Sequence, residues 1–401
     1  MQGHKYDFKE LKRDGLNVKV VSELGGRIME LSLDGFNFLF VNPVLDGVKN
    51  DQPEKSWNGI WKNFGGEKIW PAPQGWDSDR QWAGPPDNVL DGGYFKILSA
   101  DENSILTQSP VCYRTGLKIE RKISLLENQC GVRIDAEFEN CIDKIGEWSV
   151  WPVIQVATPD ENENRYAITF PAKNGYQIMH GVVNNPQYSQ EGENCRVDYK
   201  YIIGKVGANT DGEWVAYVDM QNGKTFVASA EYVQGAKYPS NTNVQIWSSG
   251  RGAIFSRGVL RIANDDRVNN PPYMEVELLS PLKKIANGEK VNYTYFMRAC
   301  TVPSGDSIKS VVGDVVISQN LSLEKSSDKT KVSAKLGAFA KGKVVLKNQN
   351  GDAICKAQEI SQSKGVIVSA EFDSSKIPEI DEIILEYFNG KHTLTIDKIK
   401  L

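Results

Sequence analysis

The sequence predicts a mainly β protein, in which a large antiparallel β unit is followed by a small C-terminal β-sandwich. Three observations lead to this prediction. From Leu16 to about Thr301, runs of alternating apolar and polar residues are separated by turn residues. No stretch keeps the spacing of an amphipathic helix beyond a turn or two. After Pro303 no Trp occurs, and Lys and Ser become frequent among short strand-like runs.

The clearest strand pair lies between residues 117 and 138. Apolar residues occupy alternate positions in 117–125 and again in 132–138, and Glu127-Asn128-Gln129 provides the turn of an antiparallel hairpin. We expect further strands within residues 18–33, 214–220, 224–233, 252–263 and 273–279. Strands in this number need two packed sheets or a barrel to bury their apolar faces.

The composition shift divides the chain into two expected domains. Residues 1–303 form the large β unit, and residues 304–401 form an Ig-like accessory β-sandwich without visible chemistry. Because accessory β domains are common in extracellular polysaccharide handling, we expect a periplasmic or secreted protein, with a signal removed, rather than a cytoplasmic one.

Charge and motifs exclude several classes of function. A net charge of −4, with Lys and Arg spread along the chain, gives no basic field for nucleic acid. No apolar run approaches the ~20 residues of a membrane helix, so we expect no membrane insertion. Six widely spaced cysteines without a C-x-x-C pair predict reduced thiols. Without H-E-x-x-H, P-loop or dinucleotide motifs, we expect no metal and no cofactor.

A long excursion of Pro, Gly, Asn, Asp and Trp interrupts the β pattern between residues 42 and 93. Its stretch NFGGEKIWPAPQGW, residues 63–76, suits neither a regular helix nor a central strand. Gly65-Gly66 permits backbone angles forbidden to other residues, and Pro71 and Pro73 stiffen the segment. The excursion also holds five of the nine tryptophans: Trp57, Trp61, Trp70, Trp76 and Trp82.

Tryptophans on a stiff loop favour a carbohydrate ligand, because indole faces bind apolar sugar faces and the indole N–H reaches a hydroxyl. We expect Trp70, Trp76 and Trp82 to be the stacking surfaces. Glu67 and Lys68 would add polar contacts. The alternative is that the aromatic loop plugs the open end of a β-sandwich.

The run YMEVELL, residues 273–279, places two carboxylates on one face of a strand. Tyr273, Glu275 and Glu277 alternate with apolar residues, so the carboxylates stand roughly 7 Å apart. Beneath an aromatic cleft they would serve as general base or hold sugar hydroxyls, whereas a solvated sheet face would have the same pattern. His180 is the one histidine in the body of the large unit. Two roles stay open for it, that of a polar loop residue and that of a catalyst.

Three ordered segments resemble the galactose-mutarotase-like superfamily, which includes the aldose 1-epimerases. They are GGRIMELSLDGFNFLFVNP (25–43), NFGGEKIWP (63–71) and YMEVELLSPLKKIANGEKVNYTYFMRA (273–299). The resemblance covers roughly residues 10 to 302 and is nearest to a bacterial branch with GGEKIWP and EVELLSPL segments. It implies a large antiparallel β-supersandwich.

The resemblance also implies residue roles. In the epimerases a carboxylate takes the proton of the anomeric hydroxyl and a histidine protonates the ring oxygen. Glu277 matches the family glutamate, with Glu275 as the competing alignment. In place of the family histidines this chain has Asp91-Gly92-Gly93, and a segment with Trp151. An enzyme of this kind would use Asp91 or His180 as its acid, and Trp151 would contact the sugar.

We therefore predict a protein that binds a mono- or oligosaccharide and acts on the anomeric centre of an aldose or uronic acid. Two alternatives stay open. A glycan lyase or hydrolase on the same scaffold would need both Glu275 and Glu277. A non-catalytic polysaccharide-binding module would tolerate Glu277→Gln in part. The sequence predicts no particular oligomeric state.

Overall fold

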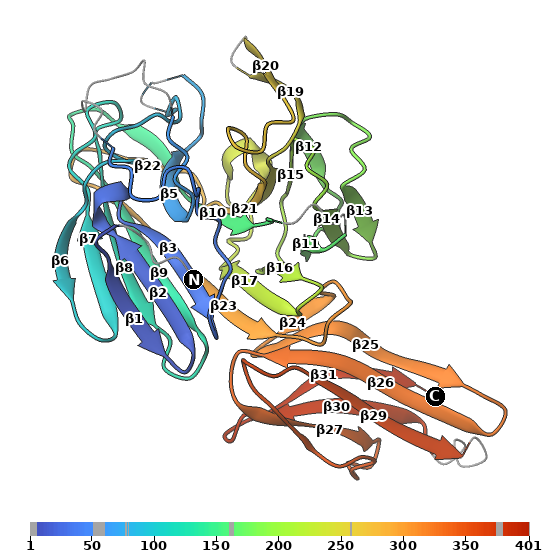
Figure 1. Cartoon of the computed structure of the whole chain (residues 1–401). Helices are drawn as coiled ribbons and strands as arrows, with labels where there is room; N and C mark the ends of the chain where they lie inside the picture. The colour runs from blue at the N-terminus through green and yellow to red at the C-terminus, as the bar shows by residue number, and fades with distance from the viewer. Residues whose placement is uncertain are drawn as a thin grey trace.

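The computed structural model describes residues 6–50, 61–76, 78, 80–159, 164–256, 259–373 and 380–400. In these ranges regular structure is almost entirely β (Figure 1). Two short 3-10 turns, Ser22–Leu24 and Pro239–Asn241, accompany the strands, and no α-helix occurs in the described ranges. The predicted fold class, a large antiparallel sandwich followed by a small one, is confirmed.

The first large sheet contains eleven described strands, and its central members carry the charged pattern of residues 273–279. Its order is β1 (Lys9–Arg13), β2 (Leu16–Val21), β3 (Arg27–Leu33), β5 (Glu67–Ala72), β10 (Gly146–Ala157), β21 (Tyr273–Leu278), β18 (Val244–Ser248), β15 (Gly204–Ala208) and β12 (Gln177–His180), with β4 (Phe36–Asn37) beside β3 and β22 (Lys283–Ile285) beside β10.

The second large sheet contains ten described strands and includes the predicted hairpin of residues 117–138. Its order is β13 (Tyr188–Glu191), β14 (Asn194–Asp198), β11 (Tyr166–Pro171), β16 (Val215–Asp219), β17 (Lys224–Ala230), β23 (Lys290–Thr301), β9 (Gly131–Asn140), β8 (Leu117–Leu125), β7 (Ser104–Gln108) and β6 (Lys96–Ala100). A separate hairpin, β19 (Gly252–Ser256) and β20 (Val259–Ala263), projects from the top of the molecule in Figure 1.

The two large sheets enclose the main core. Ile154, Val276, Ile246 and Val206 are cross-strand partners in the first sheet, and all four are fully buried in this core. Because side chains alternate along a strand, the next residue of each strand points away from the second sheet. This alternation sends the polar residues of β21 and β15 to the opposite face of the first sheet.

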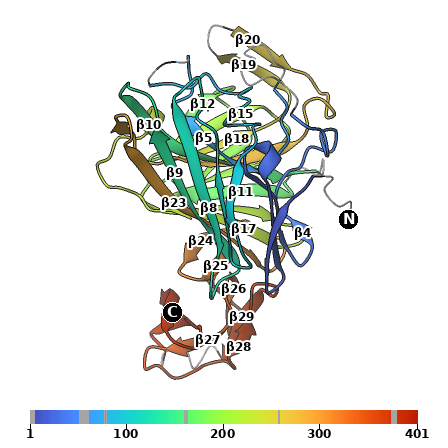
Figure 2. The same ribbon diagram turned by 90° about the vertical axis from the view of Figure 1, so that its left-hand side faces the viewer.

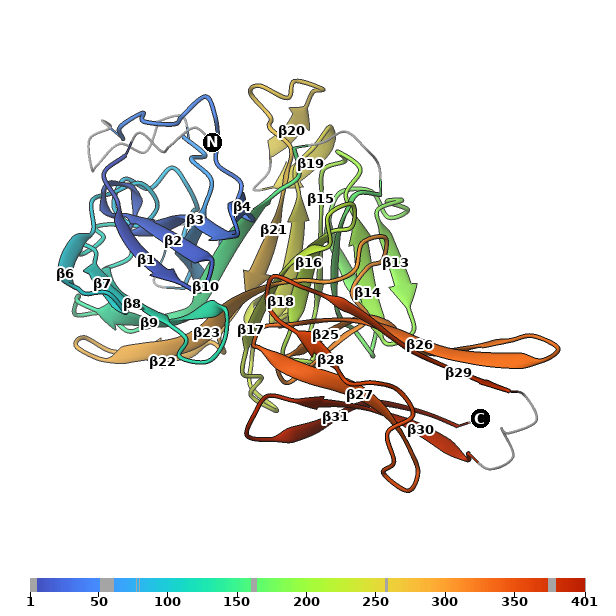
Figure 3. The same ribbon diagram turned by 60° about the horizontal axis from the view of Figure 1, so that its bottom comes forward.

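Two four-stranded sheets form the C-terminal sandwich, which lies below the main unit in Figures 1 and 2. One has the order β24 (Ser310–Val312), β25 (Val315–Lys325), β26 (Lys329–Ala338) and β29 (Val366–Asp373); the other has β28 (Gln358–Ile360), β27 (Gly342–Asn348), β30 (Glu382–Phe388) and β31 (Thr393–Lys400). They enclose a core of their own. A further apolar cluster, including Val218, Val302 and Phe339, joins the sandwich to the main unit. Figure 3 shows the sandwich from another side.

The expectation that residues 63–76 contain no central strand is wrong, because β5 lies between β3 and β10. Pro71 fits because β3 pairs with β5 only at Ile28 and Glu67, so the later part of β5 pairs on one side only. The predicted role of the glycines is confirmed. Gly65 and Gly66 have φ values of 95° and 75°, and a Cβ on Gly65 would collide with the carbonyl oxygen of Phe40.

Candidate functional site

Five polar or aromatic residues form one row across the first sheet. Gln155 of β10 lies opposite Glu275 of β21, and Glu275 lies opposite Trp247 of β18. Trp247 lies opposite Lys205 of β15, which in turn lies opposite His180 of β12. Cross-strand partners point to the same face, so segments far apart in the sequence meet on the face turned away from the main core.

A cavity of about 380 Å³ opens above this row. Aromatic side chains form much of its wall: Trp61, Trp70, Trp151, Trp247 and Tyr273. Glu275, Glu277, Lys205 and His180 supply its charged and titratable groups. The projecting hairpin adds Ile254 and Ile262 to the rim. A hollow of this size, with apolar walls and a few converging polar groups, is typical of a small-molecule site.

Asp91 holds two of the wall tryptophans in place. Its Oδ2 accepts the indole N–H of Trp61 at 2.9 Å, and its Oδ1 accepts that of Trp70 at 3.0 Å. Arg27 donates to the same Oδ1 at 3.0 Å and to the backbone oxygens of Asp91 and Gly65. Asp91 does not line the cavity, so its observed role is to orient indoles; its role as an acid stays a prediction.

Glu277 lies at the floor of the cavity and is held on one side. Its Oε2 accepts the indole N–H of Trp151 at 2.8 Å and the ammonium of Lys205 at 2.7 Å. Its Oε1 has no hydrogen-bond partner among the described residues. One oxygen of the carboxylate is therefore fixed, and the other keeps its capacity to accept a hydrogen bond.

Glu275 shares the strand and the cavity with Glu277, but its surroundings are less favourable to charge. Its Oε1 accepts an N–H of Gln155 at 2.7 Å. Burial raises the pKa of Glu275 to about 7, and the nearby Glu277 carboxylate adds to the effect. The side chain can therefore take up and release a proton near neutral pH, as a general acid or base must.

His180 reaches the cavity from the last strand of the sheet. Its ring packs edge-on against Trp247, with the centroids 6.5 Å apart. Burial and the Lys205 ammonium lower the pKa of His180, so the imidazole is neutral at pH 7. The structure thus brings His180 into the cavity that Glu275 and Glu277 line. Its catalytic role is a prediction.

The remaining predicted contact residues lie elsewhere. Glu67 faces the main core, where it pairs with Arg121 and accepts the hydroxyl of Tyr295. Trp82 is fully buried and donates its indole N–H to Asp87 at 2.8 Å. Trp76 is 66% exposed and does not line the cavity. Lys68 lies beside Glu275, and Trp57 falls outside the described residues.

Lys205 and Trp247 complete the site, although the sequence patterns did not single them out. Each stands in a short strand whose other residues are mostly apolar or small, GKVGA and VQIWS. A charged residue inside a buried strand is the signal that could have revealed Lys205, because such a residue requires a partner. Here that partner is Glu277.

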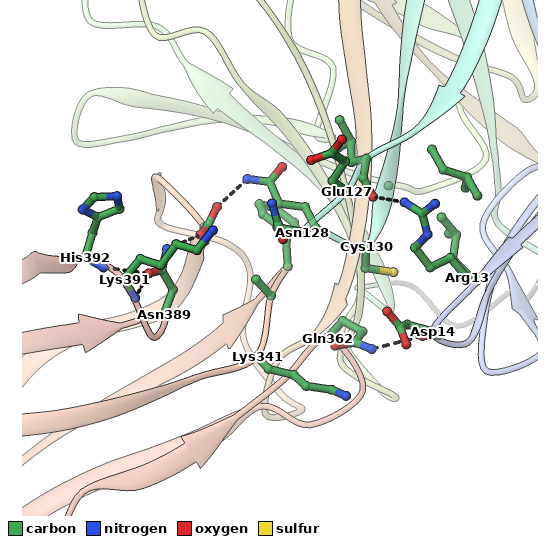
Figure 4. A pocket seen from close by; sticks show the side chains of 18 residues that line it. Arg13, Asp14, Glu127, Asn128, Cys130, Lys341, Gln362, Asn389, Lys391 and His392 are labelled. Atoms are coloured by element: carbon green, nitrogen blue, oxygen red, sulfur yellow. Dashed lines mark hydrogen bonds between the residues drawn. The ribbon is translucent and has the colours of Figure 1, made fainter. Parts of the chain in front are cut away.

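A larger cavity of about 500 Å³ lies between the main unit and the C-terminal sandwich (Figure 4). Polar groups of its lining pair with one another: Gln362 donates to the backbone oxygen of Asp14 at 3.0 Å, and Arg13 donates to that of Leu126 at 2.8 Å. Among the described residues no tryptophan lines this cavity. Gln362 joins the two units here and Arg13 pairs within the main unit, so the smaller cavity is the better candidate site.

Metal and membrane features are not found in the described part of the chain. It contains no group of three His, Cys, Asp or Glu side chains placed to hold a metal ion. None of its helices is long and apolar enough to span a membrane. The six cysteines are free, in agreement with the prediction of reduced thiols.

Comparisons with known proteins found similarity only to solved structures. No protein-family model and no curated protein matches the chain. Solved structures that it resembles include a galactose mutarotase-like protein from Lactobacillus casei (TM-score 0.48, 8% identity, 73% of this chain and 100% of that one).

The chain also resembles two further solved structures. A galactose mutarotase related enzyme from Lactobacillus acidophilus gives a TM-score of 0.48 at 11% identity, over 74% of this chain and 98% of that one. An aldose epimerase homologue from C. elegans gives 0.46 at 11% identity, over 74% and 99%. The likeness concerns the fold alone.

Proposed function

We propose that the protein binds a saccharide in the tryptophan-walled cavity and exchanges protons at its anomeric centre, so that the two anomers interconvert. The observation that carries the proposal is that Glu275 and Glu277 project from one strand into the same cavity. Indole faces at its wall suit the apolar faces of a sugar, and the carboxylates suit its hydroxyls.

The arrangement of the carboxylates favours anomer exchange over bond cleavage between sugars. Hydrolysis needs carboxylates on both sides of the scissile bond, whereas these two lie side by side on one strand. Anomer exchange needs a base at the anomeric hydroxyl and an acid at the ring oxygen. Both oxygens are bonded to one carbon, so groups on a single wall can reach them.

The proposed step assigns the base to Glu277 and the acid to Glu275. The free Oε1 of Glu277 takes the proton of the anomeric hydroxyl, whose electrons form the aldehyde C=O as the bond to the ring oxygen breaks. Glu275 gives its proton to that ring oxygen. Rotation and reclosure with reversed proton transfers yield the other anomer. His180 is the second candidate acid, although its neutral imidazole is the weaker donor at pH 7.

Proton NMR of freshly dissolved aldoses and uronic acids tests this function. We expect faster anomer equilibration with the protein than without it, and a loss of at least about 100-fold in Glu277→Gln and in Glu275→Gln. His180→Asn should retain most of the rate. Trp76→Ala is the matched control, because this indole lies outside the cavity. Sugar resonances that broaden without faster exchange would favour the non-catalytic binding module instead.

A further inference from the structure

Lys68 occupies an unusual position beside the cavity. Its side chain is about 1% exposed, and its Nζ lies 3.9 Å from Oε1 of Glu275 and 4.8 Å from the centre of the Trp70 ring. Nζ has no hydrogen-bond partner among the described residues. Lys68 itself does not line the cavity. The ammonium therefore lies beside Glu275 without lining the cavity.

A buried ammonium without hydrogen-bond acceptors is costly, and the ion pair with Glu275 at 3.9 Å and the contact with the Trp70 ring offset only part of that cost. The cost is expected to change the pKa values of both members of the pair. Burial lowers the pKa of Lys68 to about 8, while the Lys68 charge opposes the burial effect on Glu275. Both members of the pair are thus able to change charge near neutral pH.

Other charged groups also face this pair, and each has a partner of its own. Arg27 and Asp91 lie on one side of Lys68 and bind each other, and Glu277 faces both members of the pair. Lys205 lies beyond Trp247 in the same row, and its charge lowers the pKa of Glu275. Its ammonium, however, lies 2.7 Å from a carboxylate oxygen of Glu277. Lys68 is the cation whose effect on Glu275 is largest.

We propose that Lys68 is a positioning residue whose ammonium, which lies beside Glu275 and does not line the cavity, decides at which pH the cavity carboxyl holds a proton. Lys68 thereby sets the pH range of proton transfer without touching the sugar. The catalytic consequence rests on the proposed function, but the effect on Glu275 titration does not.

Carbon-13 NMR titration of the side-chain carboxyls in the ligand-free, full-length protein tests the proposal. Glu275 is assigned by the resonance that disappears in Glu275→Gln. In Lys68→Met, which keeps the volume and removes the charge, we expect the midpoint of the Glu275 titration to rise by roughly one to three pH units. An unchanged midpoint in a folded variant would overturn the proposal.

Lys68→Gln separates charge from shape, and it also serves if the methionine variant does not fold. It should raise the Glu275 midpoint as Lys68→Met does, because both variants remove the ammonium. A midpoint that stays at the wild-type value in Lys68→Gln would contradict the proposal. Lys118→Met is the matched control: this lysine lies on β8 and pairs with Glu139, so the Glu275 midpoint should not move.

The pH profile of anomer exchange provides the functional readout. In Lys68→Met, the limb that reports Glu275 should shift to higher pH by the same amount as the NMR midpoint. If the wild type exchanges no anomers, the proposed function fails while the NMR result still decides the role of Lys68. An NMR shift without a matching shift of the profile would refute control of proton transfer by Lys68.

Discussion

Adjacent residues of β5, Glu67 and Lys68, form two ion pairs on opposite faces of the first sheet, and the two pairs differ in almost every respect. Glu67 faces the core, where it contacts Arg121 directly and also accepts the hydroxyl of Tyr295. Lys68 faces the cavity side and stands 3.9 Å from Glu275 without a hydrogen bond. Both pairs are buried, but only one is closed by hydrogen bonds, so burial alone does not show that an ion pair has a structural role. The closed pair stabilises the sandwich, whereas the loose pair keeps the capacity to exchange protons.

The largest loss of stability is expected when the closed pair of Glu67 and Arg121 is broken. Glu67→Gln leaves the Arg121 guanidinium buried without its counter-charge, so the free energy of unfolding should fall by about 3–5 kcal/mol. Urea denaturation of the variant and the wild type measures this loss. A loss below about 1 kcal/mol would break the comparison, because the core pair would then be as dispensable as a surface pair.

Replacing Lys68, the cation of the loose pair, is expected to have a smaller and pH-dependent effect on the free energy of unfolding. In Lys68→Met, Glu275 stays protonated to higher pH, because the folded-state pKa rises further above its ordinary value of 4.5. The folded state then binds more protons than the unfolded state over a wider range, so stability falls as pH increases through that range. Because Lys68→Met also removes an ammonium whose burial is costly, we expect the variant to be at least as stable as the wild type at pH 6. A deficit relative to that value should then develop above pH 7, to which Glu275 contributes at most about 1.4 kcal/mol per pH unit.

Urea denaturation at several pH values measures this deficit. Glu275→Gln in the same background is the control, since it should remove the pH dependence of the deficit. A constant deficit from pH 6 to pH 9 would mean that Lys68 acts through packing rather than charge.

The smallest effect is expected at Trp76. Its indole is 66% exposed and lies outside the cavity, so Trp76→Ala should change stability by no more than about 0.5 kcal/mol and leave sugar affinity unchanged. Calorimetric titration with the best sugar from the NMR survey measures the affinity. A clear loss of affinity would extend the ligand site beyond the cavity and favour an oligosaccharide.

Sequence patterns were sufficient for the fold class and for part of the site. Alternation along residues 273–279 correctly placed Tyr273, Glu275 and Glu277 on one face, because that face depends on local periodicity alone. The positions of Trp76 and Trp82 could not be predicted, because indoles in one loop are sorted by tertiary packing. Asp87 draws Trp82 inward.

The row from Gln155 to His180 marks a further limit of sequence reasoning. Its members come from five strands, and the order of those strands in the sheet is not written in any local pattern. β5 was not predicted from the sequence, because Pro71 argues against a central strand. In the structure Pro71 fits because β3 pairs only with the start of β5. Glu275 and Lys205 come to lie on either side of Trp247 only in the assembled sheet.

β12, which carries His180, lies at the edge of the first sheet, whereas β21, which carries Glu275 and Glu277, is a central strand. β12 pairs only with β15, and its register shifts between Ile178 and His180. Strands with one neighbour open locally at lower free energy than central strands, and their amide protons exchange sooner with solvent. Local fraying of β12 would withdraw the imidazole while Glu275 and Glu277 stay fixed on β21. Such local opening at β12 would change the wall that His180 forms and leave the wall of Glu275 and Glu277 in place.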